Sequence, residues 1–339
     1  DLVVGTHGRS FWILDNITPL RHIDQQIAQS EAFLFKPQTA YRIRRSLNTD
    51  TPIPHDEPMG QNPPDGAIID YFLKSDVSTP ITLEIYDQSN KLVRRFSSAD
   101  KPEEIDEKEL RFPTYWIRLP RILPAQAGMQ RFVWDLHYPP PEGIKRDYPI
   151  SAIYRDTPSE PMGSTVLPGV YTVKLIVNGK TYTETLIVKM DPRVDTPMEG
   201  LTKMFQVSWQ NYQGLNQTNA ALIEIQGVRE KLKATREHAS QELITTITSL
   251  DQKLAALATG ERQNTNSPAI DREKNFAKVQ RDLNLLLDIV ESSDTTPTTQ
   301  TIAASEQAQS LLAELLTRWN EIKNNDIKEF DKRLQLTSQ

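Results

Sequence analysis

Hydrophobic and polar residues alternate with two different periods along the chain, and the period changes near residue 195. Before that point, short apolar runs bounded by turn residues predict strands at Leu2–Thr6, Ser10–Leu14, Ala67–Leu73, Ile81–Tyr86, Leu92–Phe96, Met129–Leu136, Val170–Val177 and Thr181–Met190. After it, apolar stripes with a period of about 3.6 predict helices over 201–232, 243–257, 276–290 and 308–322. Ile327, Phe330 and Leu334 predict one or two further helical turns packed onto them.

Proline usage marks the same boundary. Of the 23 prolines, 20 lie at or before Pro192, and only Pro197, Pro268 and Pro297 follow. Proline breaks helices but suits turns and strand edges, so the chain divides into a β-rich part and a helical part. Polar residues rich in Pro, Asp and Asn between Arg45 and Pro64 predict a linker or long loop.

The first two strands form a predicted hairpin joined by His7-Gly8-Arg9. Gly8 supplies the positive φ that a tight turn needs. Two strands are not stable alone in water, so this hairpin is expected to complete a sheet made elsewhere. Because the chain starts within a strand, at Asp1, we expect it to be the carboxy-terminal portion of a larger protein.

The later strands predict an immunoglobulin-like sandwich, because at least six short strands follow one another over about 125 residues. The last two are joined by Asn178-Gly179, the strongest short hairpin signal. Tyr138–Pro168, which is rich in proline, is expected to be a long loop on it. The four helices, joined by polar loops such as Thr259–Pro268, predict an up-down bundle.

Composition limits the possible partners. The chain of 339 residues has a net charge of -6 and no cysteine. An acidic chain is not expected to bind nucleic acid, which requires a basic face. Disulfides and thiolate chemistry are excluded, and no apolar run approaches the ~20 residues of a membrane helix.

Several segments resemble bacterial sortilin-like, BNR-repeat propeller proteins, which are also described as glycosyl hydrolase-like. The similarity covers essentially the whole chain in the family's order, and its most specific parts are GTHGRSFWILD after Val4 and the tripeptide Asp191-Pro192-Arg193. The resemblance implies a multi-bladed propeller amino-terminal to Asp1 and export from the cytoplasm. The sialidase-type Asp-box, Ser-x-Asp-x-Gly-x-Thr-Trp, does not occur, so no sialidase residue can be assigned.

Candidate chemistry is sparse. His7 and Arg9 on the hairpin turn could bind a ligand at a propeller mouth, although an ordinary turn whose arginine pairs locally explains them more simply. The histidines His7, His22, His55, His137 and His238 lack the i, i+4 spacing of a helical zinc pair. The acidic group Glu103-Glu104 with Asp106-Glu107 is local in sequence, whereas a glycosidase needs two carboxyls facing across a cleft.

The sequence therefore predicts a multidomain α+β chain with no catalytic residue, cofactor or metal. We expect a last-blade hairpin and exit segment over 1–44, a linker over 45–64, an immunoglobulin-like sandwich over 65–194 and an antiparallel helical bundle over 195–339. The expected role is a non-catalytic, extracytoplasmic scaffold that contacts the amino-terminal propeller and a protein partner or second copy. Two alternatives are an accessory part of a glycan- or peptide-hydrolysing propeller enzyme, and a carbohydrate-binding sandwich with a row of exposed aromatic side chains.

Overall fold

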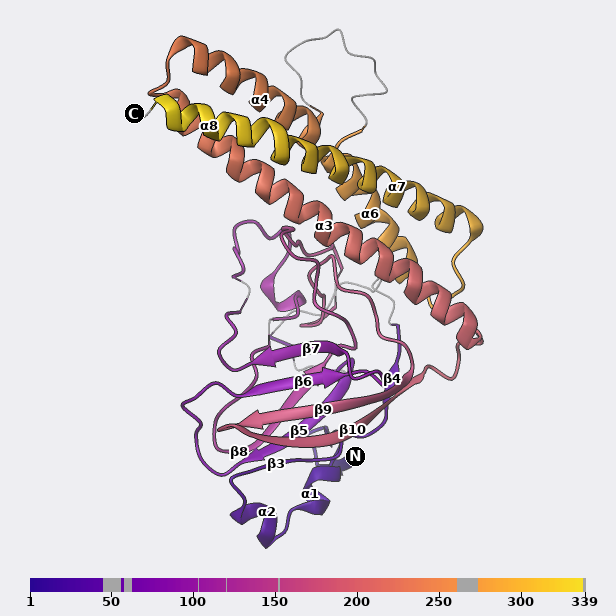
Figure 1. Ribbon diagram of the computed structural model, residues 1–339. Coiled ribbons are helices and arrows are strands. Elements are labelled where there is room, and N and C mark those ends of the chain that lie inside the picture. Colours follow the sequence, from indigo (N-terminus) through magenta and orange to yellow (C-terminus); the bar gives the residue numbers. More distant parts are fainter. Residues whose placement is uncertain are drawn as a thin grey trace. The chain divides into compact units, whose positions relative to one another are not determined.

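The computed structural model describes residues 1–44, 56–57, 63–102, 104–119, 121–151, 153–260 and 274–337 (Figure 1). The chain forms two compact units. The first, here called the sheet unit, consists of Asp1–Pro139 and Arg146–Asp195. The second, here called the helical unit, consists of Pro140–Lys145 and Thr196–Gln339. Most of the predicted linker, and the loop beyond Gly260, lie outside the described residues.

The larger sheet of the sheet unit has five strands in the order β4-β10-β9-β6-β7. Their bounds are Ala40–Arg42, Lys180–Met190, Gly169–Val177, Thr82–Tyr86 and Leu92–Ser97. All neighbours are antiparallel except β4 and β10, which run parallel. The turn between β9 and β10 places Asn178 at φ 49° and Gly179 at φ 77°, as a two-residue hairpin turn requires.

The smaller sheet has three antiparallel strands in the order β3-β5-β8, with bounds Ala32–Leu34, Ala67–Leu73 and Gly128–Trp134. The two sheets face each other in Figure 1. Ring contacts join them: Trp134 lies 5.7 Å from Tyr171, and Phe96 lies 4.6 Å from Phe132. Alternate side chains of the strands are therefore buried between the sheets, as period-two patterning predicts.

Residues 17–44 contain more regular structure than the sequence indicates. Two short helices, α1 (Thr18–His22) and α2 (Gln25–Gln29), precede β3. Strand β3 pairs with β5 through Phe33 opposite Phe72, and β4 pairs with β10. These strands of three residues are too short to show a period, so no pattern predicts them, and long-range pairing alone fixes them.

The helical unit contains α3 (Met198–Arg236), α4 (Gln241–Thr259), α6 (Phe276–Glu291), α7 (Thr299–Ile322), a π-helical turn η2 (Lys323–Ile327) and α8 (Lys328–Thr337). Side chains of Ser240, Asn275 and Thr298 cap α4, α6 and α7 by accepting hydrogen bonds from backbone N–H groups. The predicted stripes form the apolar core of this unit, which includes Leu215, Leu250, Leu254, Phe276, Leu283, Leu315 and Trp319.

The mixed α+β prediction is confirmed, and each strand and helix expected from the two periods has a counterpart, although α7 begins at Thr299, nine residues before the predicted start. The segment predicted as a long loop, Tyr138–Pro168, contains only isolated bridges, such as Asp147 opposite Glu160, among its described residues. The first loop of the sheet unit adds one 3₁₀ turn, η1 (Thr114–Trp116).

Candidate functional site

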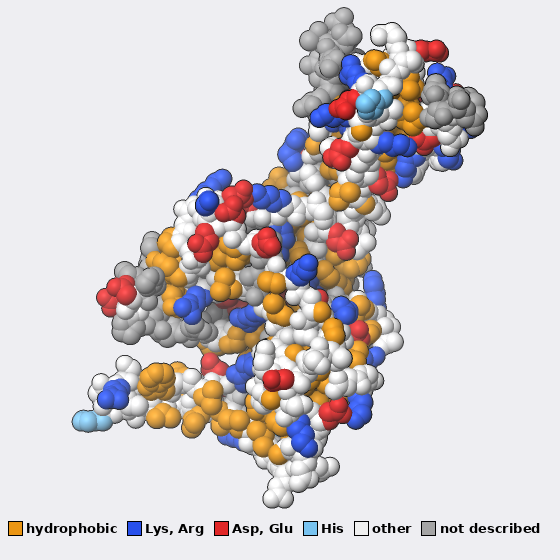
Figure 2. Space-filling model, turned by 90° about the vertical axis from the view of Figure 1, so that its left-hand side faces the viewer, with side chains coloured by type: hydrophobic (Ala, Val, Ile, Leu, Met, Phe, Trp, Pro, Cys, Tyr) orange, Lys and Arg blue, Asp and Glu red, His pale blue; other side chains and the backbone are white. Residues whose placement is uncertain are grey.

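The hairpin formed by β1 (Leu2–Gly5) and β2 (Phe11–Leu14) is a sheet of its own among the described residues. The register places Leu2 opposite Leu14 and Val4 opposite Trp12, so these four side chains share one face. Val3, Phe11 and Ile13 occupy the other face. Every strand residue is exposed, including Trp12 at 67% and Phe11 at 79%. In Figure 2, hydrophobic side chains follow the arm that projects from the sheet unit.

Both faces of this hairpin are thus apolar and uncovered. A sheet with one face toward solvent alternates apolar and polar residues, whereas a sheet covered on both faces reads as a continuous apolar run. Both edges also carry backbone N–H and C=O groups without a strand neighbour among the described residues. The hairpin therefore has the surface of a buried sheet.

The turn of the hairpin carries the two predicted ligand-binding residues. Gly8 has φ 75°, as expected for its place in the turn. The Thr6 N–H and hydroxyl both donate to Ser10 O, and Trp12 Nε1 donates to Arg9 O. In the described part of the chain, no hydrogen bond or ion pair engages the side chain of His7 or Arg9, and both residues are exposed. They share the turn, and neither side chain is packed against the rest of the sheet unit.

The base of the hairpin is anchored to the three-stranded sheet. Arg131 on β8 donates from Nε to Asp70 Oδ1 at 2.8 Å and from Nη2 to Asp70 Oδ2 at 3.2 Å. The same guanidinium donates to the carbonyl oxygens of Asp15 and Asn16, each at 2.9 Å. The Asn16 N–H donates to Asp1 Oδ1 at 2.9 Å. Planar bidentate geometry makes arginine suited to such an anchor.

The tripeptide Asp191-Pro192-Arg193 follows β10 and has a structural explanation. Arg193 donates to the Asp191 carboxylate from its backbone N–H and from Nε, each at 2.9 Å, and from Nη2 at 2.5 Å. The side-chain hydrogen bonds of Arg193, followed by its backbone N–H, lower the pKa of Asp191 to about 2. The pair shapes the turn that ends the sheet unit.

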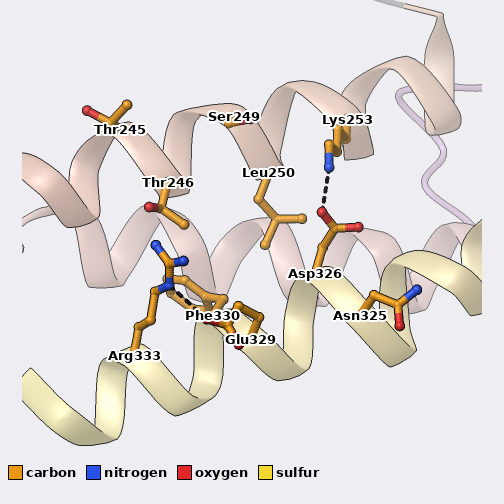
Figure 3. A pocket seen from close by; sticks show the side chains of 10 residues that line it. All are labelled: Thr245, Thr246, Ser249, Leu250, Lys253, Asn325, Asp326, Glu329, Phe330 and Arg333. Atoms are coloured by element: carbon orange, nitrogen blue, oxygen red, sulfur yellow. Dashed lines mark hydrogen bonds and ion pairs between the residues drawn. The ribbon is translucent and has the colours of Figure 1, made fainter.

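A groove of about 510 Å³ lies in the helical unit, between α4 on one side and η2 with α8 on the other (Figure 3). Its apolar lining is Leu250 and Phe330, both nearly fully buried. The charged lining is already engaged: Lys253 pairs with Asp326, and Arg333 pairs with Glu329. Thr245 and Thr246 donate back to carbonyls of α4 itself.

These contacts pair the charged side chains of the groove with one another. Each charged group named here has a partner, and the ion pairs are largely exposed, where such pairs contribute little. No group of three or more His, Asp or Glu side chains able to hold a metal occurs in the described ranges. The groove is consequently explained by helix packing around the π-helical turn.

The hydrogen bonds of His137 join it to neighbouring parts of the sheet unit. Its carbonyl oxygen accepts from Trp134 Nε1 at 3.0 Å, and its Nε2 lies 3.1 Å from Thr165 Oγ1. These contacts tie the end of β8 to the segment before β9. His55 and Glu103, both noted in the sequence, lie outside the described residues.

Sequence reasoning found the hairpin but missed its anchor. Asp70 and Arg131 lie 54 and 115 residues from Asn16, and an isolated Asp or Arg on a strand carries no signal of such a partner. Asp70 and Arg131 lie directly opposite each other on the antiparallel strands β5 and β8. Their ion pair can therefore be predicted only once the pairing of these strands is known.

Comparison with known proteins adds no relative from which a role could be transferred. No protein family matches the sequence, and neither a curated protein nor a solved structure is similar enough to count as a match. No helix in the described ranges is both long and apolar enough to span a bilayer.

Proposed function

We propose that this chain is a non-catalytic scaffold and interaction region of an extracytoplasmic β-propeller protein. In this proposal the hairpin β1–β2 supplies strands to the last blade of a propeller formed by the same protein. The two sheets act as an immunoglobulin-like sandwich and the helices as an antiparallel four-helix bundle that together support the propeller. The proposal rests chiefly on the hairpin, whose apolar side chains are exposed on both faces.

The geometry of the hairpin limits the kind of partner. A flat protein surface would cover only one of the two apolar faces, and pairing with a sheet edge alone would cover neither. Blades of a propeller are small antiparallel sheets arranged radially, so each blade has neighbours on both faces. A strand pair inserted there gains edge hydrogen bonds and burial of both faces at once, which suits Trp12 and Phe11 on opposite faces.

The non-catalytic part of the proposal rests on the surroundings of the candidate side chains. Among the described residues, the potential acid, base and metal-ligating side chains around the groove and the hairpin turn either have structural partners or stand singly. The test is turnover of glycan and peptide substrate panels by the chain. Robust turnover that a single substitution within these residues abolishes contradicts the proposal.

The test of the hairpin's role is protection in the longer polypeptide. We expect the amides of 2–5 and 11–14 to exchange at least ten times more slowly when the propeller encoded by the same gene is present than in the chain alone. Quenching of Trp12 fluorescence by iodide is expected to fall in parallel. A hairpin that stays equally exposed in the longer polypeptide refutes its assignment to a propeller blade.

A further inference from the structure

A short segment of the long loop between β8 and β9 belongs to the helical unit, although the chain on both sides of it belongs to the sheet unit. This segment, Pro140–Lys145, is here called the strap. Its sequence is Pro-Pro-Glu-Gly-Ile-Lys, and it lies on α3. The contacts that hold it involve mainly its backbone.

Two asparagines of α3, one turn apart, bracket the peptide unit of Glu142. The Glu142 N–H donates to Asn216 Oδ1 at 2.9 Å. The Glu142 carbonyl oxygen accepts from Asn219 Nδ2 at 2.5 Å. The Glu142 side chain takes no part in either bond, and the residue is exposed. These asparagines therefore bind the backbone N–H and C=O groups of Glu142. They make no contact that would restrict the side chain at this position.

A hydrogen bond to α6 holds the Asn219 amide in the orientation that binds the strap. The Asn219 side chain is buried, and its Oδ1 accepts from Gln280 Nε2 of α6 at 2.7 Å. That bond fixes the orientation of the amide, so that Nδ2 points to the strap. A buried amide with both ends engaged is costly to leave without one partner, because its desolvation is then uncompensated.

The backbone conformation and the space at the next residue of the strap both favour glycine. Gly143 has φ 71°, a left-handed conformation that costs other L-residues about 1–2 kcal/mol. A Cβ on Gly143 would also lie 2.8 Å from Ile223 Cδ1 and 3.2 Å from Asn219 Cβ. The helix surface therefore selects a residue without a side chain directly after the bracketed peptide unit.

The strap also approaches α3 in a restricted conformation. Pro139, Pro140 and Pro141 precede Glu142, and consecutive prolines favour an extended backbone with little freedom to lose. Pro141, directly before the bracketed peptide unit, is buried. The strap therefore has the features of a peptide ligand. A stiff, extended proline segment comes first, then a residue bound through its backbone, and then a glycine in a left-handed conformation.

We propose that Asn216, Asn219 and Ile223 form a peptide-docking site on α3, and that the strap is its occupant, bound reversibly within the same chain. The site recognises an extended proline-rich segment followed by any residue and a left-handed glycine. Tethering on both sides keeps the strap at an effective concentration on the order of millimolar. A strap that is mostly docked at that concentration implies a dissociation constant for the free peptide of about 1 mM or below.

The experiment uses the full chain carrying Gly143→Val, which vacates the site, and a synthetic peptide spanning residues 138–146. We expect the amide of Glu142 to exchange at least ten times faster in this variant than in the parent chain. Asparagine side-chain NMR signals of the variant should then shift as the peptide is added up to about 5 mM, whereas the parent chain should show no saturable shift because its own strap competes.

Two controls separate docking from general strain. Gly179→Val imposes a similar left-handed penalty at φ 77°, but nothing lies within 4 Å of its added Cβ, so it should leave exchange at Glu142 unchanged. Adding Asn219→Ala to Gly143→Val should abolish peptide binding. Unchanged Glu142 exchange in Gly143→Val, no peptide binding to the vacated site, or equal binding of a peptide with valine in place of the glycine each overturns the proposal.

Discussion

Replacing Arg131 by methionine should loosen the hairpin base and the three-stranded sheet together. The substitution keeps the aliphatic stem but removes four hydrogen bonds, two to the Asp70 carboxylate and two to backbone carbonyls. Asp70 keeps only 6% of its side-chain surface exposed, so its carboxylate would be left largely desolvated. Its remaining contact, from Asn16 Nδ2 at 3.4 Å, is long.

The expected magnitude follows from this burial. Breaking a fully buried ion pair costs about 3–5 kcal/mol, and exposed pairs contribute less than about 1 kcal/mol. Arg131 is 35% exposed while Asp70 is not, so we expect a loss of about 2–4 kcal/mol in the opening free energy of β5 and β8. Much of that loss is the uncompensated carboxylate, so adding Asp70→Asn should restore part of it, with a coupling of about 1–3 kcal/mol.

Hydrogen exchange followed by mass spectrometry is the suitable assay, because a chain of two units does not unfold in one transition. Peptides covering β5, β8 and residues 15–17 report the opening of the anchor. Arg95→Met is the matched control, since Arg95 is exposed on β7 and its loss should change stability by less than about 0.5 kcal/mol. If Arg131→Met also changes the opening free energy of β5 and β8 by less than about 0.5 kcal/mol, Arg131 does not anchor the hairpin base.

Three further outcomes are expected. Because Arg193 lowers the pKa of Asp191 to about 2, its ionised form stabilises the fold above the ordinary pKa of 3.8, and this contribution is lost as the pH falls from 3.8 toward 2; carbon-13 titration of the carboxyl should show the low midpoint, and Arg193→Ala should raise it. Leu215→Ala should cost about 2–5 kcal/mol in the opening of α3. Asn211→Leu should cost less, about 1–2 kcal/mol, because it breaks the hydrogen bond from Asn211 Nδ2 to Ser305 Oγ but removes the buried Oδ1 that has no partner. Ser240→Ala should cost about 1 kcal/mol and speed amide exchange in the first turn of α4.

The parts of the fold that sequence predicts are those encoded by local periodicity. Leu243 to Leu257 repeats every three or four residues, and the helix α4 forms there. The pair Asn178-Gly179 predicts its hairpin because a two-residue turn needs positive φ at both positions. Each of these signals lies within about a dozen residues, so no knowledge of distant partners is required.

The features that sequence does not predict depend on partners far along the chain. Strand β4 exists because Ala40–Arg42 pairs with residues 188–190, and three residues give no measurable alternation. The strap looks like an ordinary loop segment, because its glycine is needed only where it meets Ile223, 80 positions later. A proline run ending in Glu-Gly was the available signal, but many loops contain one.

The hairpin is both exposed and anchored at its base. Exposed apolar strands without an anchor would be expected to fray, since each ordered residue costs about 1–2 kcal/mol of backbone entropy. Here the base of the hairpin is instead held by Arg131 through two backbone carbonyls and a bidentate carboxylate. Such an anchor does nothing to bury Trp12 or Phe11, but it ties the residues that follow β2 to the three-stranded sheet. Under the proposed role of the hairpin, an anchored base lowers the entropy lost when a partner sheet covers both faces, so the proposal accounts for the anchor and the uncovered faces together.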